Sequence, residues 1–367
     1  MRCYPTDGSR FHRFAGVMAR QVVNEAVCAE CDNAVGRHQG PVVAHSYDYP
    51  VGAVGAALVA VGKGETYAAA ARHARATTRR PPTARDDGGQ LVANWVEVFA
   101  GSIISHYAET AWPETLLLDA TAFKVPDLAT GKQKLAFWVL AAYGYPAGAP
   151  RGSLWALMAS PQGAQADWLR LLSVLDGAPA MVITDDSGTA AAGARLRWAA
   201  EERPAITRCE WHLRDNALKL MVAHGLGAAS APRKLVASAF TSPARWQAFN
   251  HAATPHRNLA AWVARNDGVV TAQVARRQVL PAHHSLAAVE AALAHVGQRI
   301  ERRAYLLRNE ARTNLLLGLM RLDLNGPADE RSYPSIIRRH LVACQGEPAP
   351  QLTIVDPRGF PSLRPRV

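Results

Sequence analysis

The stretch from Ala180 to Asn216 constrains the fold of this chain more than any other part of it. It opens with the apolar run AMVIT, which predicts a short buried strand over 180–184 because glycine and proline bound it. Two acids, Asp185 and Asp186, follow directly, and sheet proteins tend to place their chemistry at this carboxyl end of a strand. The stretch continues with a helical run, a second short strand and a Cys-x-x-His pair, namely 188–200, 205–208, Cys209 and His212.

Three more strands precede this stretch. Thr115 to Lys124 carries Asp119 after three leucines, and two apolar runs and a helix follow, at 135–145, 153–160 and 165–175. We therefore expect an α/β domain with a mixed sheet of five strands, in which an antiparallel meander is followed by parallel strands joined through helices. This is the element order of a ribonuclease-H-like fold. In such a sheet the first and fourth strands are neighbours, so Asp119 should face Asp185.

Two carboxylates held together in an apolar sheet predict a divalent cation. They repel each other and lose hydration, and a cation resolves both effects. Oxygen ligands suit Mg²⁺ or Mn²⁺, and two such ions about 4 Å apart can activate an attacking oxygen and stabilise a leaving oxygen in phosphoryl transfer. Taken alone, Asp119 is typical of a turn at a strand end and Asp185 of a helix N-cap. Either Asp185 or Asp186 could be the ligand of that pair.

The sequence after the sheet predicts a basic helical insertion and then a long helix. The insertion contains helical runs at 216–224, 233–239, 244–251 and 256–263. Its Trp246 and Trp262 suit either an apolar core, the more common role, or stacking on bases. Ser285 can cap the long helix, which has an apolar face formed by Leu286, Val289, Leu293, Val296 and Ile300. Glu290 lies near that face and is a candidate third carboxylate; the alternative is a solvated Glu favoured by the helix dipole.

The N-terminal region combines a candidate zinc site with a candidate DNA-binding unit. Cys28 and Cys31 have the spacing of a zinc knuckle, but no second Cys pair accompanies them, so a metal-free pair is the alternative. Residues 51–76 predict two short helices around a Gly-Lys-Gly turn, which matches either a helix-turn-helix or an ordinary helical hairpin. A further helix is expected over 91–108. Arginines near this unit and on the long helix are candidate phosphate contacts: Arg72, Arg75, Arg79, Arg80, Arg299 and Arg303.

Composition supports a nucleic-acid partner inside a cell. The 367 residues carry a net charge of +11 and a pI near 9.8, which indicates DNA first, with an anionic membrane surface or a merely arginine-rich surface as alternatives. Five cysteines in so long a chain predict a reducing compartment rather than a disulfide framework. Because the sequence has neither a long apolar run nor a signal-peptide core, we expect no membrane contact and a cytoplasmic protein, nucleoid-associated when bound to DNA.

Together these motifs resemble a known family. LLLDAT around Asp119, VITDD at Asp185, the Cys209-x-x-His212 motif and a distal Glu290 on a long helix rich in Arg and Asn are similar to the Mutator-like DDE transposases, a group that includes bacterial insertion-sequence enzymes. The resemblance covers residues 90–325. The N-terminal Cys pair and helices are similar, more loosely, to the zinc-ribbon and helix-turn-helix front end of related transposases.

The resemblance implies a DNA transposase, a polynucleotidyl transferase on a ribonuclease-H-like domain. Asp119, Asp185 and Glu290 match the catalytic residues that hold Mg²⁺ or Mn²⁺, which activates water for strand cleavage; the freed 3′-hydroxyl then attacks target DNA. Cys209 and His212 match the Cys-x-x-His motif, as a structural pair or with Zn²⁺. The expected partners are double-stranded DNA (element ends and target) and further copies in a homo-oligomer. The alternatives are a catalytically retired DNA-binding protein or regulator, and a ribonuclease-H-like nuclease.

We therefore divide the chain into six segments. They are a degenerate zinc-ribbon-like segment (1–50), a helix-turn-helix-like DNA-binding domain with its linker (51–111), the first part of the ribonuclease-H-like core (112–212), the helical insertion (213–284), the C-terminal helices of the catalytic domain (285–325) and a loosely ordered basic tail (326–367).

Overall fold

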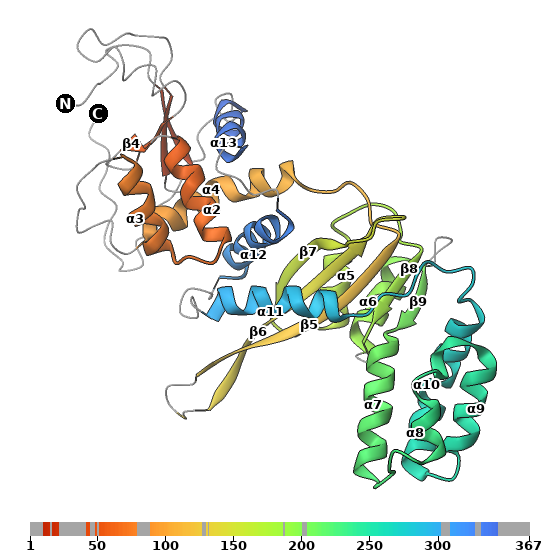
Figure 1. Cartoon of the computed structure of the whole chain (residues 1–367). Coiled ribbons are helices and arrows are strands. Elements are labelled where there is room, and N and C mark those ends of the chain that lie inside the picture. Colours follow the sequence, from red (N-terminus) through yellow and green to blue (C-terminus); the bar gives the residue numbers. More distant parts are fainter. Residues whose placement is uncertain are drawn as a thin grey trace. The chain divides into compact units, whose positions relative to one another are not determined.

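The computed structural model divides the chain into two compact units. It describes residues 10–14, 17–21, 42–44, 48–49, 51–78, 89–126, 130, 132–185, 188–199, 204–301, 309–326 and 332–343. The terminal unit combines residues 1–108 with residues 311–367, and the central unit spans residues 109–310. The elements of both units are labelled in Figure 1. The predicted zinc ligands Cys28 and Cys31 lie outside the described residues.

The terminal unit joins a small sheet to a group of helices. Its antiparallel sheet has the order β1-β2-β3-β4, with bounds Arg10–Phe14, Val17–Gln21, Val42–Ala44 and Asp48–Tyr49. Three helices follow, namely α2 (Val51–Gly62), α3 (Tyr67–Thr78) and α4 (Gln90–His106). Helices α2 and α3 pack on each other across a tight turn, in which Gly64 has a φ of 99° that favours glycine. The predicted helical pair is therefore present, and its role in reading DNA stays a prediction.

Two C-terminal helices complete the terminal unit. They are α12 (Glu310–Asn325) and α13 (Ser332–Ala343). Arg312 of α12 forms an ion pair with Glu97 of α4, and α13 packs on α2 and α4 through buried residues at helical spacing: Tyr333, Ile336, Ile337 and Leu341. The structure thus differs from our division of the chain, because nearly all of α12 groups with the N-terminal helices and the expected loose tail contains a packed helix.

The central unit is built on a five-stranded mixed sheet. Its strands are β5 (Thr115–Pro126), β6 (Gln133–Tyr145), β7 (Ser153–Ser160), β8 (Met181–Thr184) and β9 (Ala205–Arg208). Their order is β7-β6-β5-β8-β9, in which β5, β6 and β7 are antiparallel neighbours while β8 runs parallel to β5 and β9. The mixed α/β architecture and the predicted pairing of the first and fourth strands are confirmed.

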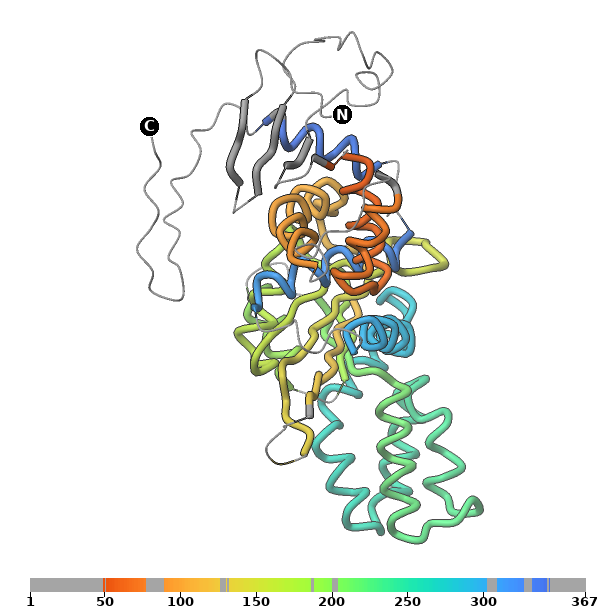
Figure 2. Tube along the Cα trace, turned by 90° about the vertical axis from the view of Figure 1, so that its left-hand side faces the viewer, coloured from red at the N-terminus to blue at the C-terminus, as the bar shows by residue number. Residues whose placement is uncertain are grey.

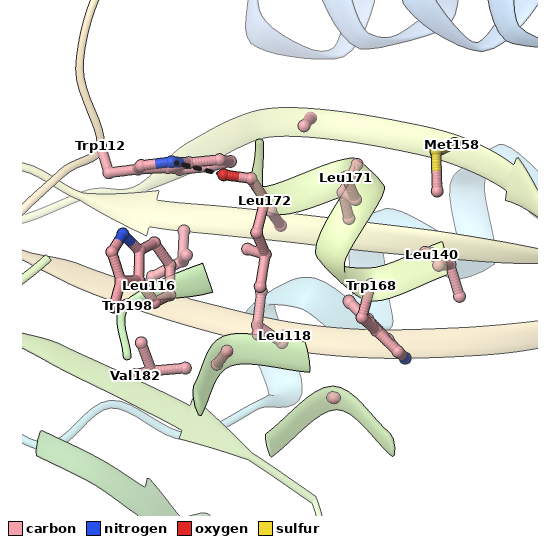
Figure 3. Close-up of a cluster of buried hydrophobic side chains, with 14 residues drawn as sticks. Trp112, Leu116, Leu118, Leu140, Met158, Trp168, Leu171, Leu172, Val182 and Trp198 are labelled. Carbon is pink, nitrogen blue, oxygen red and sulfur yellow. Dashed lines mark hydrogen bonds between the residues drawn. The ribbon is translucent and has the colours of Figure 1, made fainter. Parts of the chain in front are cut away.

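Two helices cover one face of this sheet and form the main core. They are α5 (Gln165–Leu172) and α6 (Gly188–Arg197). Figure 3 shows leucines of β5 and β6 packed against Trp168 and Leu172 of α5, with the Trp112 indole N–H donating to the Leu172 carbonyl at 3.2 Å. The apolar stripe of α5 is therefore part of the core.

The insertion between β9 and the last helix of the unit is helical, as predicted. Figures 1 and 2 show its α-helices side by side as a bundle, namely α7 (Glu210–Ala223), α8 (Ala231–Leu235), α9 (Pro243–Ala253) and α10 (Arg257–Ala275). Trp246 and Trp262 are buried in its own apolar cluster, so both are core residues. Helix α7 begins six residues before the predicted start, directly after Cys209, and this brings the Cys-x-x-His motif onto its first turn.

Candidate active site

Asp119 and Asp185 lie side by side on neighbouring parallel strands. The last pair of the β5–β8 ladder joins Leu118 to Thr184, so the next residue along each chain segment is an aspartate. Side chains alternate along a strand, and Leu116 and Leu118 point into the core beneath α5 and α6. Asp119 therefore faces the opposite side of the sheet. Because β5 continues to Pro126 while β8 ends, both acids lie where the two strands part.

Helix α11 (Ala287–Glu301) covers this second face of the sheet. It packs on β5 and β6, and its predicted apolar stripe is buried in full: Leu286, Val289, Leu293, Val296 and Ile300. The Ser285 hydroxyl accepts a hydrogen bond from the Ala287 N–H at 3.2 Å, as expected for a capping residue. Glu290 lies in the first turn of the helix, beside the buried stripe. The helix thus directs Glu290 toward the face that carries Asp119.

The Cys-x-x-His motif joins this group from β9 and α7. The Cys209 N–H donates to the Thr184 carbonyl at 2.9 Å, which extends the β8–β9 pairing to the residue before Asp185. Cys209 is fully buried, and the first turn of α7 carries His212 over the same face. The Nε2 atom of His212 lies 3.0 Å from Oε1 of Glu290. His212 of the motif therefore holds Glu290, the third predicted carboxylate, through a contact between their side chains.

The ionisable groups of this site perturb one another. Burial, with the charges of Asp185 and Glu290 adding to it, raises the pKa of Asp119 to about 6 from 3.8, against a hydrogen bond from the Ala120 N–H that lowers it. The Cys209 side chain is the largest cause of the raised pKa of His212, and burial partly opposes it. Burial alone would raise the pKa of Cys209, but His212 and the Leu286 N–H outweigh it and lower that pKa. The protonation of Cys209 and that of His212 are thus coupled to each other.

The donor set fits a hard divalent cation in its chemistry, but its members are not all turned toward one another. Asp119 and Asp185 offer oxygen atoms, and a cation beside Asp119 would offset the burial that chiefly raises its pKa. Glu290 is engaged by His212 instead. Within the described residues, no three His, Cys, Asp or Glu side chains are grouped closely enough to hold a metal ion. A cation site made of Asp119, Asp185 and Glu290 would need Glu290 to leave His212.

A groove leads away from the carboxylates along the sheet. It has a volume of about 1430 Å³ and runs between α11 and the long β5–β6 hairpin, which Figure 1 shows extending beyond the sheet. Asp119 and Glu290 line one part of it, and Phe123 and Phe137, whose rings stack with centroids 5.3 Å apart, line another. The acids are therefore open to a ligand of considerable size.

The predicted phosphate-binding arginines have mixed outcomes. Arg72 is exposed on α3, whereas Arg75 is only 6% exposed because it continues the inner face of that helix. Arg75 is thus corrected from a surface contact to a buried residue. Arg299 on α11 is half-buried. Three other predicted residues lie outside the described part of the chain: Arg79, Arg80 and Arg303.

Sequence reasoning missed a polar joint that fixes the start of α7. Two buried amides of α10 reach back to the sheet edge: Asn266 bonds the Arg208 side chain, and Gln273 accepts from the Arg208 N–H at 3.1 Å and donates to Glu210 at 3.2 Å. The joint is completed by an ion pair of Arg277 with Glu210 and by a His283 contact with the Arg208 carbonyl at 3.1 Å. The sequence signal was the spacing of Asn266, Gln273 and Arg277, which recurs on one helical face.

Comparison with known proteins adds no assignment to this geometry. No protein-family model matches the chain, and no curated protein matches it. Among the helices that the structure describes, none is both long and apolar enough to cross a membrane. The interpretation of the site therefore depends on its own residues.

Proposed function

We propose that this protein is a DNA transposase of the DDE type, with Asp119, Asp185 and Glu290 as its catalytic carboxylates. The observation that carries the proposal is the neighbouring position of Asp119 and Asp185 on parallel strands, beneath a helix that brings Glu290 to the same face. Asp119 and Glu290, from distant parts of the sequence, line the same open groove, and the raised pKa of Asp119 in such a place supports a role in binding or catalysis.

The sheet supports a ribonuclease-H-like identity for the central unit. An antiparallel meander followed by two parallel strands, with the first and fourth strands adjacent, is the arrangement that we expect for that fold. The insertion lies between the second Asp and the Glu, as the resemblance to Mutator-like transposases implies. The net charge of +11 supports DNA as the partner, and the exposed Arg72 on α3 supports contact with its phosphates.

Each residue of the site has a distinct part in the proposed chemistry. Asp119, Asp185 and Glu290 would hold Mg²⁺ or Mn²⁺, which supplies charge stabilisation at the phosphate during phosphoryl transfer. Asp119 and Asp185 are held by the sheet, so they form the rigid part of the set. Glu290 is the adjustable member, because it would exchange His212 for the ligand. Hydrolysis would leave a 3′-hydroxyl, and the attack of that hydroxyl on a target phosphate would join the strands and release the target's own 3′-hydroxyl.

Calorimetric titration of Mn²⁺ tests the site directly. The wild-type chain would be compared with Asp119→Ala and Glu290→Ala, with Glu114→Ala as a matched control because Glu114 is an exposed acid directly before β5. We expect Mn²⁺ binding to be lost or strongly weakened in both site variants and kept in the control. The titration is repeated with DNA present, because DNA could complete the site. Equal binding in all four proteins under both conditions, or no binding in any of them, would overturn the proposal.

A second function is favoured by the pairing of Glu290 with His212. A catalytically retired transposase that binds or regulates DNA would need no cation, and its Glu290 could stay on His212. Nicking of a supercoiled plasmid in Mn²⁺ separates the two readings: the active enzyme nicks it and Asp119→Ala does not, whereas a retired protein binds the plasmid without cutting. Cutting without any joining of the released ends would instead indicate a ribonuclease-H-like nuclease.

A further inference from the structure

One tryptophan differs from all the others in its exposure. The chain has nine tryptophans, and each lies within a described range. Eight are buried or half-buried, while Trp211 is 52% exposed. Single exposed apolar side chains are common on protein surfaces, so the exposure of Trp211 points to a ligand only together with its position in the fold.

Trp211 lies at the rim of the candidate active site. It occupies the first turn of α7, next to His212, and the two rings meet edge to face with centroids 5.0 Å apart and an interplanar angle of 89°. The same His212 contacts Glu290 at 3.0 Å. Trp211 is therefore two contacts from the carboxylates, and the polar joint that fixes the start of α7 also fixes its backbone.

The surroundings of Trp211 do not suit a protein interface. Helix α7 has one other exposed large apolar residue, Val222, which is three turns away and so about 16 Å along the axis. Between them are the polar or charged residues Arg214, Asp215 and Lys219, of which Lys219 and Asp215 form an ion pair. A stable protein interface needs a contiguous buried patch, and among the described residues α7 offers only an isolated ring.

We propose that Trp211 is a positioning residue that stacks on an unpaired base of the bound nucleic acid, next to the phosphate at which the carboxylates would act. This inference rests on the proposed function. An exposed indole presents a flat π-face, and base stacking on such a face is tolerant of sequence. Stacking beside His212 and Glu290 would fix the strand relative to Asp119 and Asp185. The ligand class is single-stranded DNA, or a duplex frayed at its end.

The test uses the full chain in EDTA, so that binding is measured without cleavage. The probes are a labelled 20-nucleotide single strand and a blunt 20-base-pair duplex. Binding is followed by anisotropy, and exposure of Trp211 by iodide quenching of tryptophan fluorescence, with Trp211→Phe giving the share due to that residue. We expect the single strand to protect Trp211 from iodide, and Trp211→Ala to weaken its binding on the order of tenfold. Val222→Ala is the matched control on the same helix and should bind as the wild type does.

Three results would overturn this inference: equal binding by wild type and Trp211→Ala, continued iodide quenching in the complex, or no binding of either probe. The outcome is separable from that of the proposed function. A protein that stacks a base on Trp211 but nicks no plasmid in Mn²⁺ keeps the binding site and loses the catalytic assignment. If the wild type nicks the plasmid and Trp211→Ala binds the single strand as well as the wild type does, the catalytic assignment is kept and the stacking role is lost.

Discussion

His212 and Glu290, from two helices far apart in the sequence, meet with Nε2 and Oε1 3.0 Å apart. His212 is in turn adjacent to the buried side chain of Cys209. Burial raises the pKa of Cys209, and His212 lowers it. The Cys-x-x-His motif therefore acts on the third carboxylate through one side chain. This relationship gives the motif a physical role that needs no zinc ion.

Removing the His212 ring should impair catalysis more than binding. In His212→Ala, Glu290 loses the partner that holds it near Asp119 before it turns to the cation, and misplacement of a catalytic group by about 1 Å can cost about 100-fold in rate. We expect plasmid nicking in Mn²⁺ to fall by about that factor while DNA binding is kept. His251→Ala, an exposed histidine of α9, serves as the control. Nicking by His212→Ala at the wild-type rate would contradict the positioning role.

Asp119 should destabilise the fold at neutral pH. Its pKa is about 6 in the folded state, against the ordinary value of 3.8 in the unfolded state. Between these two values the folded state keeps a proton that the unfolded state has released, so stability is lost as pH rises from about 3.8 to about 6. Asp119→Asn keeps an oxygen that can accept from the Ala120 N–H and removes the charge. We expect the variant to be more stable at pH 7.5 by about 1–3 kcal/mol in urea unfolding, with the difference vanishing below about pH 4.

The same pair of proteins gives an independent check on the cation. Adding Mn²⁺ at pH 7.5 should stabilise the wild type against urea, because a ligand that binds only the folded state stabilises it. The Asp119→Asn variant should gain little. An equal gain in both proteins would mean that the ion binds elsewhere.

His283 should make stability depend on mildly acidic pH. Burial lowers its pKa, with Arg277 adding to this, while Glu210 and the Arg208 carbonyl oppose it. The unfolded state therefore takes up a proton first, so stability is full above pH 6.5 and falls as pH decreases toward the folded pKa. His283→Gln retains an N–H donor for the Arg208 carbonyl and should flatten this fall between pH 7 and pH 5. The same fall in both proteins would assign it to another group; His251→Gln is the exposed control.

Gly193 should be intolerant of a side chain, unlike a glycine in the insertion. A Cβ atom at Gly193 of α6 would lie 2.5 Å from the Cβ of Trp168 and 3.1 Å from the Gln165 carbonyl, whereas Gly268 in α10 has open space. Gly193→Ala should cost about 1–3 kcal/mol through overpacking of α5 on α6. Gly268→Ala should gain about 0.5–1 kcal/mol through helix propensity. Thermal unfolding measures both, and a Gly193→Ala chain as stable as the wild type would contradict this packing.

Several features of the fold and site were predictable because their signals are local. The strand over 153–160 and the apolar stripe of α11 follow from short-range periodicity, which depends on the residues themselves. The pairing of the strands that carry Asp119 and Asp185 followed from the order of elements, since few topologies accommodate it. The Cys-x-x-His motif was expected where the strand passes into a helix, but the helical run predicted over 216–224 begins six residues earlier in the structure, because the polar first turn of α7, with Glu210 and His212, lacks an apolar period.

What the sequence determined by itself is the strands of the central sheet and most of the helices around them, the position of three acids on these elements, and the positive charge that favours a polyanionic partner. Tertiary structure alone decided that Arg75 is buried, that α12 and α13 pack with the N-terminal helices, and that His212 holds Glu290. The physical reason is that periodicity reports which side of an element is apolar, whereas a side chain's partner depends on which other element packs against it. Trp211 belongs to the second kind, because only the assembled fold leaves its ring exposed beside the carboxylates.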